Sequence, residues 1–123
     1  MAASGLTLGD IAGLPWILSP QGSVLRHRTD MMFRRAGLAP PCNVVDTTAL
    51  LLIISLLQQT DNLHVLPVEV ARYYVSLNML SILPIELPCK MDGFGIITRR
   101  SRLLSPGANV LLTAIRTAAH ELY

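Results

Sequence analysis

The sequence predicts an α/β fold with three layers, α/β/α, in which helices cover both faces of a parallel sheet. Short apolar runs bounded by Gly, Pro and polar residues alternate with longer stretches of helical periodicity, and this alternation is typical of α/β proteins. Strand and helix follow one another three times, and then come a strand, a Pro-rich turn, another strand and a final helix. Repeated strand–helix units build a parallel sheet, because each helix returns the chain to the same end of the sheet.

The first unit begins with a short helical turn and a buried strand. Thr7 is suited to cap a turn that runs through Asp10 to Ala12, because a threonine hydroxyl accepts from the free N–H groups of a helix start. The apolar run Trp16–Leu18 then predicts a short strand. The polar stretch Ser19–Ser23 follows this strand as a loop.

The first long helix is predicted over residues 25–36. Its apolar face is formed by residues that recur at helical spacing: Leu25, Thr29, Met32, Phe33 and Ala36. Its charged residues fall mostly on the other side: Arg26, Arg28, Asp30, Arg34 and Arg35. Gly37 is placed to end the helix, and Pro40–Pro41 prevent its return.

The most apolar stretch, TTALLLIISLLQQ at residues 47–59, predicts a buried helix rather than a membrane span. A span needs about 20 apolar residues, and the run Ala49–Leu57 is less than half that long. Asn43–Val45 precedes it as a second strand, and Thr47 or Thr48 is expected to cap the helix. Since no apolar run is longer and the N-terminus lacks a signal-peptide pattern, we expect a cytoplasmic protein with no membrane partner.

Five further elements are predicted after residue 62. They are a strand at Leu63–Leu66, a helix from Pro67 to Asn78, strands at Leu80–Leu83 and Phe94–Thr98, and a helix opened by Ser105–Pro106. The last helix carries an apolar stripe: Val110, Leu111, Ala114, Ile115, Ala118 and Leu122.

The composition is very apolar for a free-standing soluble monomer. Charged residues make up 15% of the chain and hydrophobic residues 51%, and the mean hydropathy is +0.47. This balance indicates apolar surface that is covered by a partner or by a part of the protein outside this chain. Two fully buried helices are an equally good explanation.

The charged and sulfur-containing residues exclude several classes of partner. A net charge of +2 is too small to indicate nucleic acid, and the basic clusters at 26–35 and 99–102 are interpreted as solvated faces rather than phosphate-binding patches. Cys42 and Cys89 lie far apart without a neighbouring Cys or His. They are interpreted as reduced thiols, so no metal, cofactor or disulfide is expected.

The carboxyl ends of the predicted strands mark the candidate site, because ligands of open α/β sheets bind there. Three corners lead into a helix N-terminus: Ser19–Ser23, Asp46–Thr48 and Leu66–Pro67. Helix N-termini carry free N–H groups and a partial positive charge, and hydroxyls at Ser19, Ser23, Thr47 and Thr48 add polar groups. The corners predict a pocket for a small anionic or polar molecule. Ordinary helix capping by the same side chains is the alternative.

Catalytic patterns do not stand out in the sequence. It contains no G-x-S-x-G, P-loop, G-x-G-x-x-G or H-E-x-x-H. His27, His64 and His120 are scattered, and His64 is interpreted as a packed or hydrogen-bonded residue of an apolar strand. We therefore do not expect an enzyme.

Three long stretches share the order and spacing of features found in one family. They are LTLGDIAGLPWILSPQGSVLRHRTDMMFRRAGLAPP, NVVDTTALLLIISLLQQTDNLHVLPVEVARYY and FGIITRRSRLLSPGANVLLTAIRTAA, and they extend from about Leu6 to Ala119. In this order they resemble the effector-binding domain of LysR-type transcriptional regulators. The resemblance rests on many features rather than on one motif, and it implies a protein that senses an inducer and thereby regulates transcription.

The resemblance implies a fold similar to type II periplasmic binding proteins, with two α/β lobes around a ligand cleft. Residues 1–88 would form the second lobe, and residues 89–123 would form the crossover and the closing strand and helix of the first lobe. Effector contacts carry over to four corner positions: Ser19, Thr47, Thr48 and Pro67. The implied ligand is a small-molecule inducer, anionic or sugar-like.

The winged helix-turn-helix and most of the first lobe of that family have no counterpart in this sequence. We therefore expect DNA binding only through a missing N-terminal domain. The strand Phe94–Thr98 and the final helix are expected to self-associate or to pair with a full-length regulator. The alternative function is a stand-alone truncated lobe that acts as an interaction and oligomerisation module without DNA binding of its own.

Overall fold

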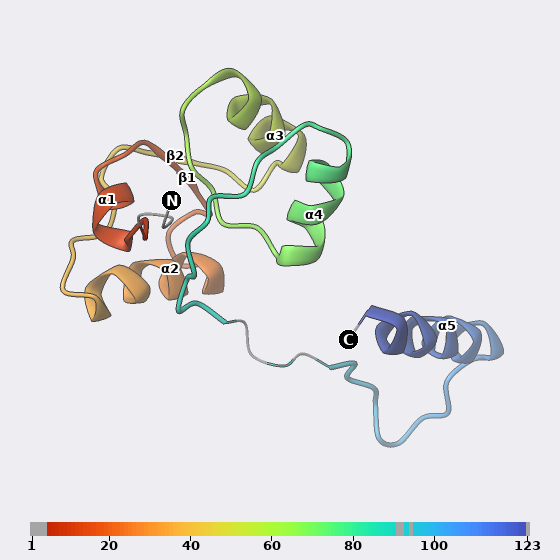
Figure 1. Ribbon diagram of the computed structural model, residues 1–123. Coiled ribbons are helices and arrows are strands. Elements are labelled where there is room, and N and C mark those ends of the chain that lie inside the picture. The colour runs from red at the N-terminus through yellow and green to blue at the C-terminus, as the bar shows by residue number, and fades with distance from the viewer. Residues whose placement is uncertain (1–4, 91–92, 94, 123) are drawn as a thin grey trace. The chain divides into compact units, whose positions relative to one another are not determined.

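The protein is represented by a computed structural model that describes residues 5–90, 93 and 95–122. The chain divides into two compact units, one up to Lys90 and one after it. Unit 1 contains every helix and strand from α1 to α4, and unit 2 contains α5 (Figure 1). Each unit is described below by itself.

Three parallel segments form the centre of unit 1. Strand β1 (Trp16–Leu18) pairs in parallel with β2 (Val44–Asp46), and Leu18 lies opposite Asp46. Leu63 forms a single parallel bridge on the other side of β1. The Ile17 amide donates to the Leu63 carbonyl over 2.8 Å, and the Leu63 amide donates to the Pro15 carbonyl over 2.9 Å. β1 is therefore the middle segment, and the carboxyl ends of all three lie at one edge.

Two helices and β1 enclose the main core of unit 1. Helix α1 (Leu8–Ala12) begins at Thr7, which forms the predicted cap. Helix α2 (Val24–Arg35) supplies two buried apolar residues, Met32 and Phe33. They pack with buried Ile11, Trp16 and Leu18.

Trp16 connects these core elements through two directional contacts. Its indole N–H donates to the Ile11 carbonyl over 3.0 Å, which satisfies the polar atom of a buried side chain. Its ring meets Phe33 edge to face, with 5.5 Å between the ring centroids, a favoured arrangement for aromatic pairs.

Gly37 ends α2, as the sequence predicted. It adopts φ 74°, a conformation that costs a residue with a Cβ atom free energy. The Gly37 amide donates to the Arg34 carbonyl over 3.0 Å, and the Leu38 amide donates to the Phe33 carbonyl over 2.9 Å. This pair of bonds is a Schellman motif, and it satisfies carbonyls that the helix end leaves free.

The most apolar helix is less buried than the sequence predicted. Helix α3 (Leu50–Gln59) buries only Ile53 and Ile54, and Leu51 is 83% exposed. Helix α4 (Val68–Ser76) has no buried residue. Both lie on the side of the strands opposite to α1 and α2 (Figure 1), but β1 offers this face a single inward residue, Ile17, because side chains alternate along a strand. A three-residue strand cannot cover two helices, and the prediction of a fully buried helix was therefore wrong.

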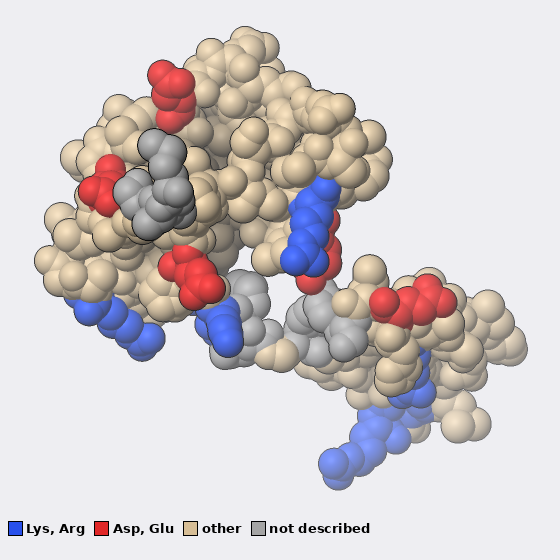
Figure 2. Space-filling model, viewed as in Figure 1, with Lys and Arg blue, Asp and Glu red and all other residues tan. Residues whose placement is uncertain are grey.

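The surface of unit 1 is correspondingly apolar. Figure 2 shows few charged side chains over this unit. Its exposed large apolar residues include Leu50, Leu52, Val68 and Tyr73. None of the helices among the described residues is long and apolar enough to cross a membrane.

Three predicted strands are not formed as strands. Residues 63–66 contribute only the bridge between Leu63 and Trp16. The Ile17 carbonyl, which a longer parallel ladder would use as its next acceptor, is bound by the His64 side chain instead. Residues 80–83 lie in no strand, and Ile82 and Leu83 are exposed. Residues 95–98 also lie outside strands, while Phe94 lies outside the described residues. Strand formation requires an adjacent strand to receive the backbone hydrogen bonds, and the described residues provide none beside these two segments.

Among its described residues, unit 2 contains one long helix, α5 (Pro106–Leu122), preceded by residues that lie outside helices and strands. The Ser105 hydroxyl accepts from the Ala108 amide over 3.2 Å, which confirms the predicted helix start. No described residue of α5 is buried.

Candidate functional site

Two of the three predicted corners lie side by side at the carboxyl edge of the strands. Ser19 follows β1 and Thr47 follows β2. The Thr47 amide donates to the Leu18 carbonyl over 3.0 Å, so the parallel pairing continues one residue beyond β2. The strand register therefore brings Ser19 and Thr47 together.

A buried arginine joins these two corners, and sequence reasoning missed it. The Arg26 Nη1 atom donates to the Ser19 carbonyl over 3.1 Å and to Asp46 Oδ1 over 2.7 Å. Its Nε atom donates to Asp30 Oδ1 over 3.2 Å. Only 8% of the Arg26 side chain is exposed. The assignment of Arg26 to the solvent side of the helix was wrong, because two carboxylates and a carbonyl compensate its burial.

The sequence contained a pattern that could have identified this arginine. Arg26 and Asp30 are four residues apart, so they are neighbours on a helix. Asp46 directly follows two apolar strand residues at the carboxyl end of the predicted strand. An ion pair across this edge was thus open to prediction, but only with knowledge of which strands are adjacent.

Helix capping accounts for part of the hydroxyl pattern. Ser23 is the N-cap of α2, and its Oγ accepts from the Arg26 amide over 3.2 Å. The N-cap of α3 is Ala49 rather than Thr47 or Thr48, because the Thr47 Oγ1 accepts from the Ala49 amide over 3.1 Å and closes a turn before the helix. The capping alternative therefore holds for Ser23, and the prediction of a threonine cap on α3 was wrong.

Two hydroxyl groups at this edge take no part in hydrogen bonds among the described residues. Thr48 is exposed and Ser19 is half-buried. Across the part of the chain that the structure describes, neither side chain makes a hydrogen bond, whereas Thr47 uses its acceptor position within the turn. Ser19 and Thr48 are therefore the predicted residues whose hydroxyls remain open to a ligand.

The third corner stands apart from this hydrogen-bond network. Pro67 is exposed and forms the N-cap position of α4, where its carbonyl accepts from the Ala71 amide over 2.9 Å. It comes after the parallel segment at Leu63, so it lies beyond the same edge of the sheet. No hydrogen bond among the described residues connects it to Ser19 or Thr47.

His64 lies beside β1 as a hydrogen-bonded residue, in agreement with its interpretation from the sequence. Its Nδ1 lies 2.7 Å from the Ile17 carbonyl, so Nδ1 carries the proton and donates. Burial lowers the pKa of His64 from its usual value of 6.5, against the opposing effect of the bond to Ile17. The ring is therefore neutral at pH 7 and adds no positive charge to this edge.

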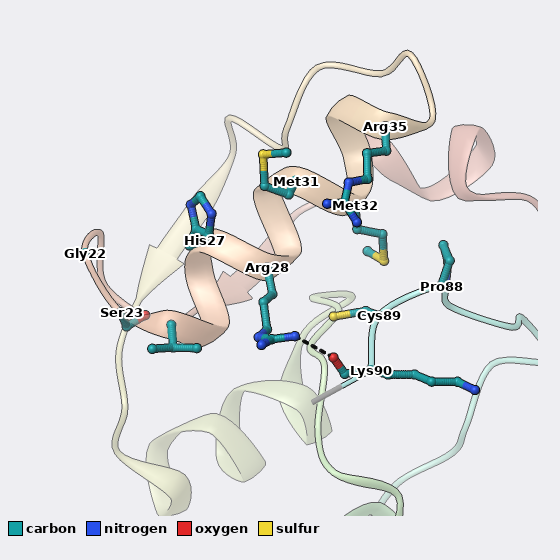
Figure 3. A pocket seen from close by; sticks show the side chains of 11 residues that line it. Gly22, Ser23, His27, Arg28, Met31, Met32, Arg35, Pro88, Cys89 and Lys90 are labelled. Atoms are coloured by element: carbon teal, nitrogen blue, oxygen red, sulfur yellow. Dashed lines mark hydrogen bonds between the residues drawn. The ribbon is translucent and has the colours of Figure 1, made fainter. Parts of the chain in front are cut away.

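A pocket of unit 1 lies elsewhere, along α2. It has a volume of about 860 Å³, and its walls are one face of α2 and the segment 88–90 (Figure 3). Arg28 Nη1 donates to the Lys90 carbonyl across it over 2.7 Å. None of Ser19, Thr47, Thr48 and Pro67 lines this pocket.

The described residues contain no group of three or more His, Cys, Asp or Glu side chains placed to bind a metal ion. Cys42 and Cys89 are free thiols.

Comparison with known proteins identifies relatives over nearly the whole chain. The family profile described as LysR substrate binding domain matches residues 2–120. The chain is 31% identical to the HTH-type transcriptional regulator GbpR of Azospirillum brasilense, over 93% of this chain and 33% of that protein. It is 33% identical to the HTH-type transcriptional regulator GalR of Pseudomonas putida, over 94% of this chain and 29% of that protein. No solved structure matches the chain.

Proposed function

The chain belongs to the LysR substrate binding domain family, and from this premise we propose that it binds a small-molecule effector on behalf of a transcription regulator. Two relatives that match most of the chain are named as HTH-type transcriptional regulators, which supports regulation rather than catalysis. The family implies an α/β fold like that of type II periplasmic binding proteins, and the mixed α/β structure agrees with this class.

The chain is proposed to be one part of a larger regulator protein. The chain spans about a third of the length of the curated relatives it matches. We propose that DNA contact belongs to a different part of the whole regulator, and that the regulator works in the cytoplasm. Within the effector domain, residues 1–88 are proposed to form the second lobe, and residues 89–123 the crossover and the closing strand and helix of the first lobe.

The single observation that supports this function best is the shared edge at the ends of β1 and β2. Parallel pairing brings Ser19 and Thr47 together, and the hydroxyls of Ser19 and Thr48 are open to a ligand. Ligands of α/β sheets bind beyond the carboxyl ends of strands. Ser19, Thr47, Thr48 and Pro67 are proposed as effector contacts. The family match lends no separate support to the interaction-module alternative.

A Thr48→Val variant tests the site. Threonine and valine have almost the same shape, and Thr48 is exposed, so the fold should not change. We expect affinity for an activating ligand, found by screening a metabolite panel for thermal stabilisation, to fall about fivefold or more, as for the loss of one hydrogen bond. The matched control is Thr113→Val on α5, which should leave binding unchanged. Equal binding by wild type and Thr48→Val would remove Thr48 from the site.

A further inference from the structure

The pocket along α2, here called the α2 pocket, has the size of a ligand site but an elongated form (Figure 3). Its lining includes Val24 in the first turn of α2 and Arg35 in the last. At 1.5 Å per residue, this stretch of helix is about 17 Å long. The volume of about 860 Å³ lies within the range of about 300–1,000 Å³ for small-molecule sites. An elongated ligand would therefore fill this pocket better than a compact one.

Apolar side chains form much of the inner surface of the α2 pocket. Helix α2 contributes Met32, which is buried, and Val24, which is 64% exposed. The segment 88–90 contributes Pro88, which is exposed, and Cys89, which is half-buried. Methionine adapts its shape to irregular apolar partners. A hydrocarbon chain placed here would cover the exposed surfaces of Val24 and Pro88, and removal of apolar area from water favours binding.

The ionisable groups of the α2 pocket include bases and, among the described residues, no carboxylate. The bases are His27, Arg28, Arg35 and Lys90. Arg28 holds the two walls together through its bond of 2.7 Å to the Lys90 carbonyl. The Lys90 side chain extends away from α2 (Figure 3). Arg35 is exposed, and its side chain makes no ion pair with another described residue. It is three residues from Met32 and hence its neighbour on the helix, so a cation stands next to the apolar surface.

We propose that the α2 pocket is a second ligand site, and that its ligand is a monocarboxylate with a flexible hydrocarbon chain. The carboxylate pairs with Arg35, whose planar guanidinium suits it, and the chain runs over Met32 toward Val24. The opposite orientation is less favourable, because the helix N-terminus offers only about half a positive charge and the Ser23 hydroxyl already accepts from the Arg26 amide.

This inference goes beyond the proposed function and does not depend on it. The four residues proposed as effector contacts all lie outside the lining of the α2 pocket. A ligand here would also differ from the effector in kind, because the apolar surface requires a hydrocarbon chain rather than a set of polar groups.

Octanoate, butyrate and 1-octanol are suitable probes, because they separate the effect of chain length from the effect of charge. Titrations of the full chain followed by amide NMR measure the affinity and show where each probe binds. We expect octanoate to bind about tenfold or more tightly than butyrate, and about threefold or more tightly than 1-octanol. Amides of α2 and of residues 88–90 should shift, and those of Ser19 and Thr47 should not.

An Arg35→Gln variant tests the proposed ion pair. It should weaken octanoate binding about threefold or more, to the level of 1-octanol, and leave 1-octanol binding unchanged. Arg34→Gln is the matched control, because it removes the same charge from the adjacent exposed residue, which does not line the pocket. Both positions are exposed, and amide spectra establish that each variant is folded. Equal weakening by the two variants would show that net charge attracts the ligand, and would overturn the inference.

The two free thiols give an independent measure of where octanoate binds. Cys89 lines the α2 pocket, whereas Cys42 is exposed and lies outside the lining. Bound octanoate should slow the alkylation of Cys89 by iodoacetamide and leave that of Cys42 unchanged. The inference is overturned if Cys89 is not selectively protected, if butyrate or 1-octanol binds as tightly as octanoate, or if only the amides of Ser19 and Thr47 shift. The effector edge has its own test in Thr48→Val, so either proposal can fail without the other.

Discussion

Helices α2 and α5 have the same kind of sequence but different surroundings. Both carry an apolar stripe at helical spacing, and the same periodicity predicted both. In α2 the central residues of the stripe, Thr29, Met32 and Phe33, are buried, and Phe33 is fully covered. In α5 no described residue is buried, and Val110 is 72% exposed. The difference shows that periodicity specifies a helix and its apolar face, whereas burial depends on a strand or helix that the periodicity does not encode.

Removing one large side chain from each helix is the most direct test of the difference in burial between α2 and α5. Phe33→Ala should lower the free energy of unfolding of unit 1 by about 3–5 kcal/mol, because it deletes a buried ring and leaves a cavity beside Trp16. The control, Ile115→Ala on α5, should change it by less than about 0.5 kcal/mol. Urea denaturation followed by Trp16 fluorescence measures both. Equal effects would mean that α5 is buried to the same degree in solution.

Loss of the buried arginine should have the next largest effect. Arg26→Ala leaves the carboxylates of Asp30 and Asp46 without their cation. Since Asp46 is half-exposed, water compensates part of this loss, and we expect about 1–3 kcal/mol. Arg116→Ala on α5 is the matched control, with an expected change near zero. The same denaturation assay applies, and an Arg26→Ala variant as stable as the control would contradict the network.

Two glycine-to-alanine substitutions should change stability in opposite directions. Gly37→Ala should cost about 1–2 kcal/mol, because Gly37 holds a left-handed conformation at the end of α2. Gly107 lies within α5, and a Cβ there would meet nothing within 4 Å, so Gly107→Ala should stabilise α5 by about 0.5 kcal/mol. Thermal unfolding measures the first, and helix content by circular dichroism measures the second. Two changes of the same sign would contradict the contrast.

The smallest expected effect is a pH dependence carried by His64. Its lowered pKa means that the unfolded chain binds this proton more readily than the folded protein. The contribution is therefore fully present above the usual pKa of about 6.5 and is lost as the pH falls from there toward the lowered value. In His64→Gln, stability should decline less between about pH 8 and pH 5. His120→Gln on α5 is the control. A steeper decline in His64→Gln than in the wild type would contradict the assignment.

Local features of the fold were predictable from the sequence. The cap at Thr7 and the end of α2 at Gly37 each depend on neighbouring residues only, and each is confirmed. The strand Trp16–Leu18 is also confirmed, but its pairing partners lie far away in the chain. Strands that need a distant partner were not predictable in the same way. The segment 80–83 has a suitable apolar run, but no adjacent strand among the described residues accepts its hydrogen bonds.

At the candidate site, too, features set by neighbouring residues were predictable, and features set by residues far away in the chain were not. The sequence placed Ser19 and Thr47 at strand ends, and their side-by-side position follows from the pairing of β1 and β2. The sequence did not predict that Arg26 is buried at the site, because a group of basic residues on a helix is typical of a solvent-exposed face. The burial of Arg26 depends on Asp46, which is 20 residues away in the chain. The effector contacts proposed for Ser19, Thr47, Thr48 and Pro67 remain predictions.

The central position of β1 also sets an order of events during synthesis. β1 is made before both of its neighbours, and the amide of Ile17 finds its acceptor only after Leu63 has been added. Loop closure between distant segments is slow compared with helix formation. A nascent chain that ends before Leu63 therefore carries β1 with one edge open, and elongation through this residue completes the sheet. The chain of α5 is made afterwards, so unit 1 can fold before α5 leaves the ribosome.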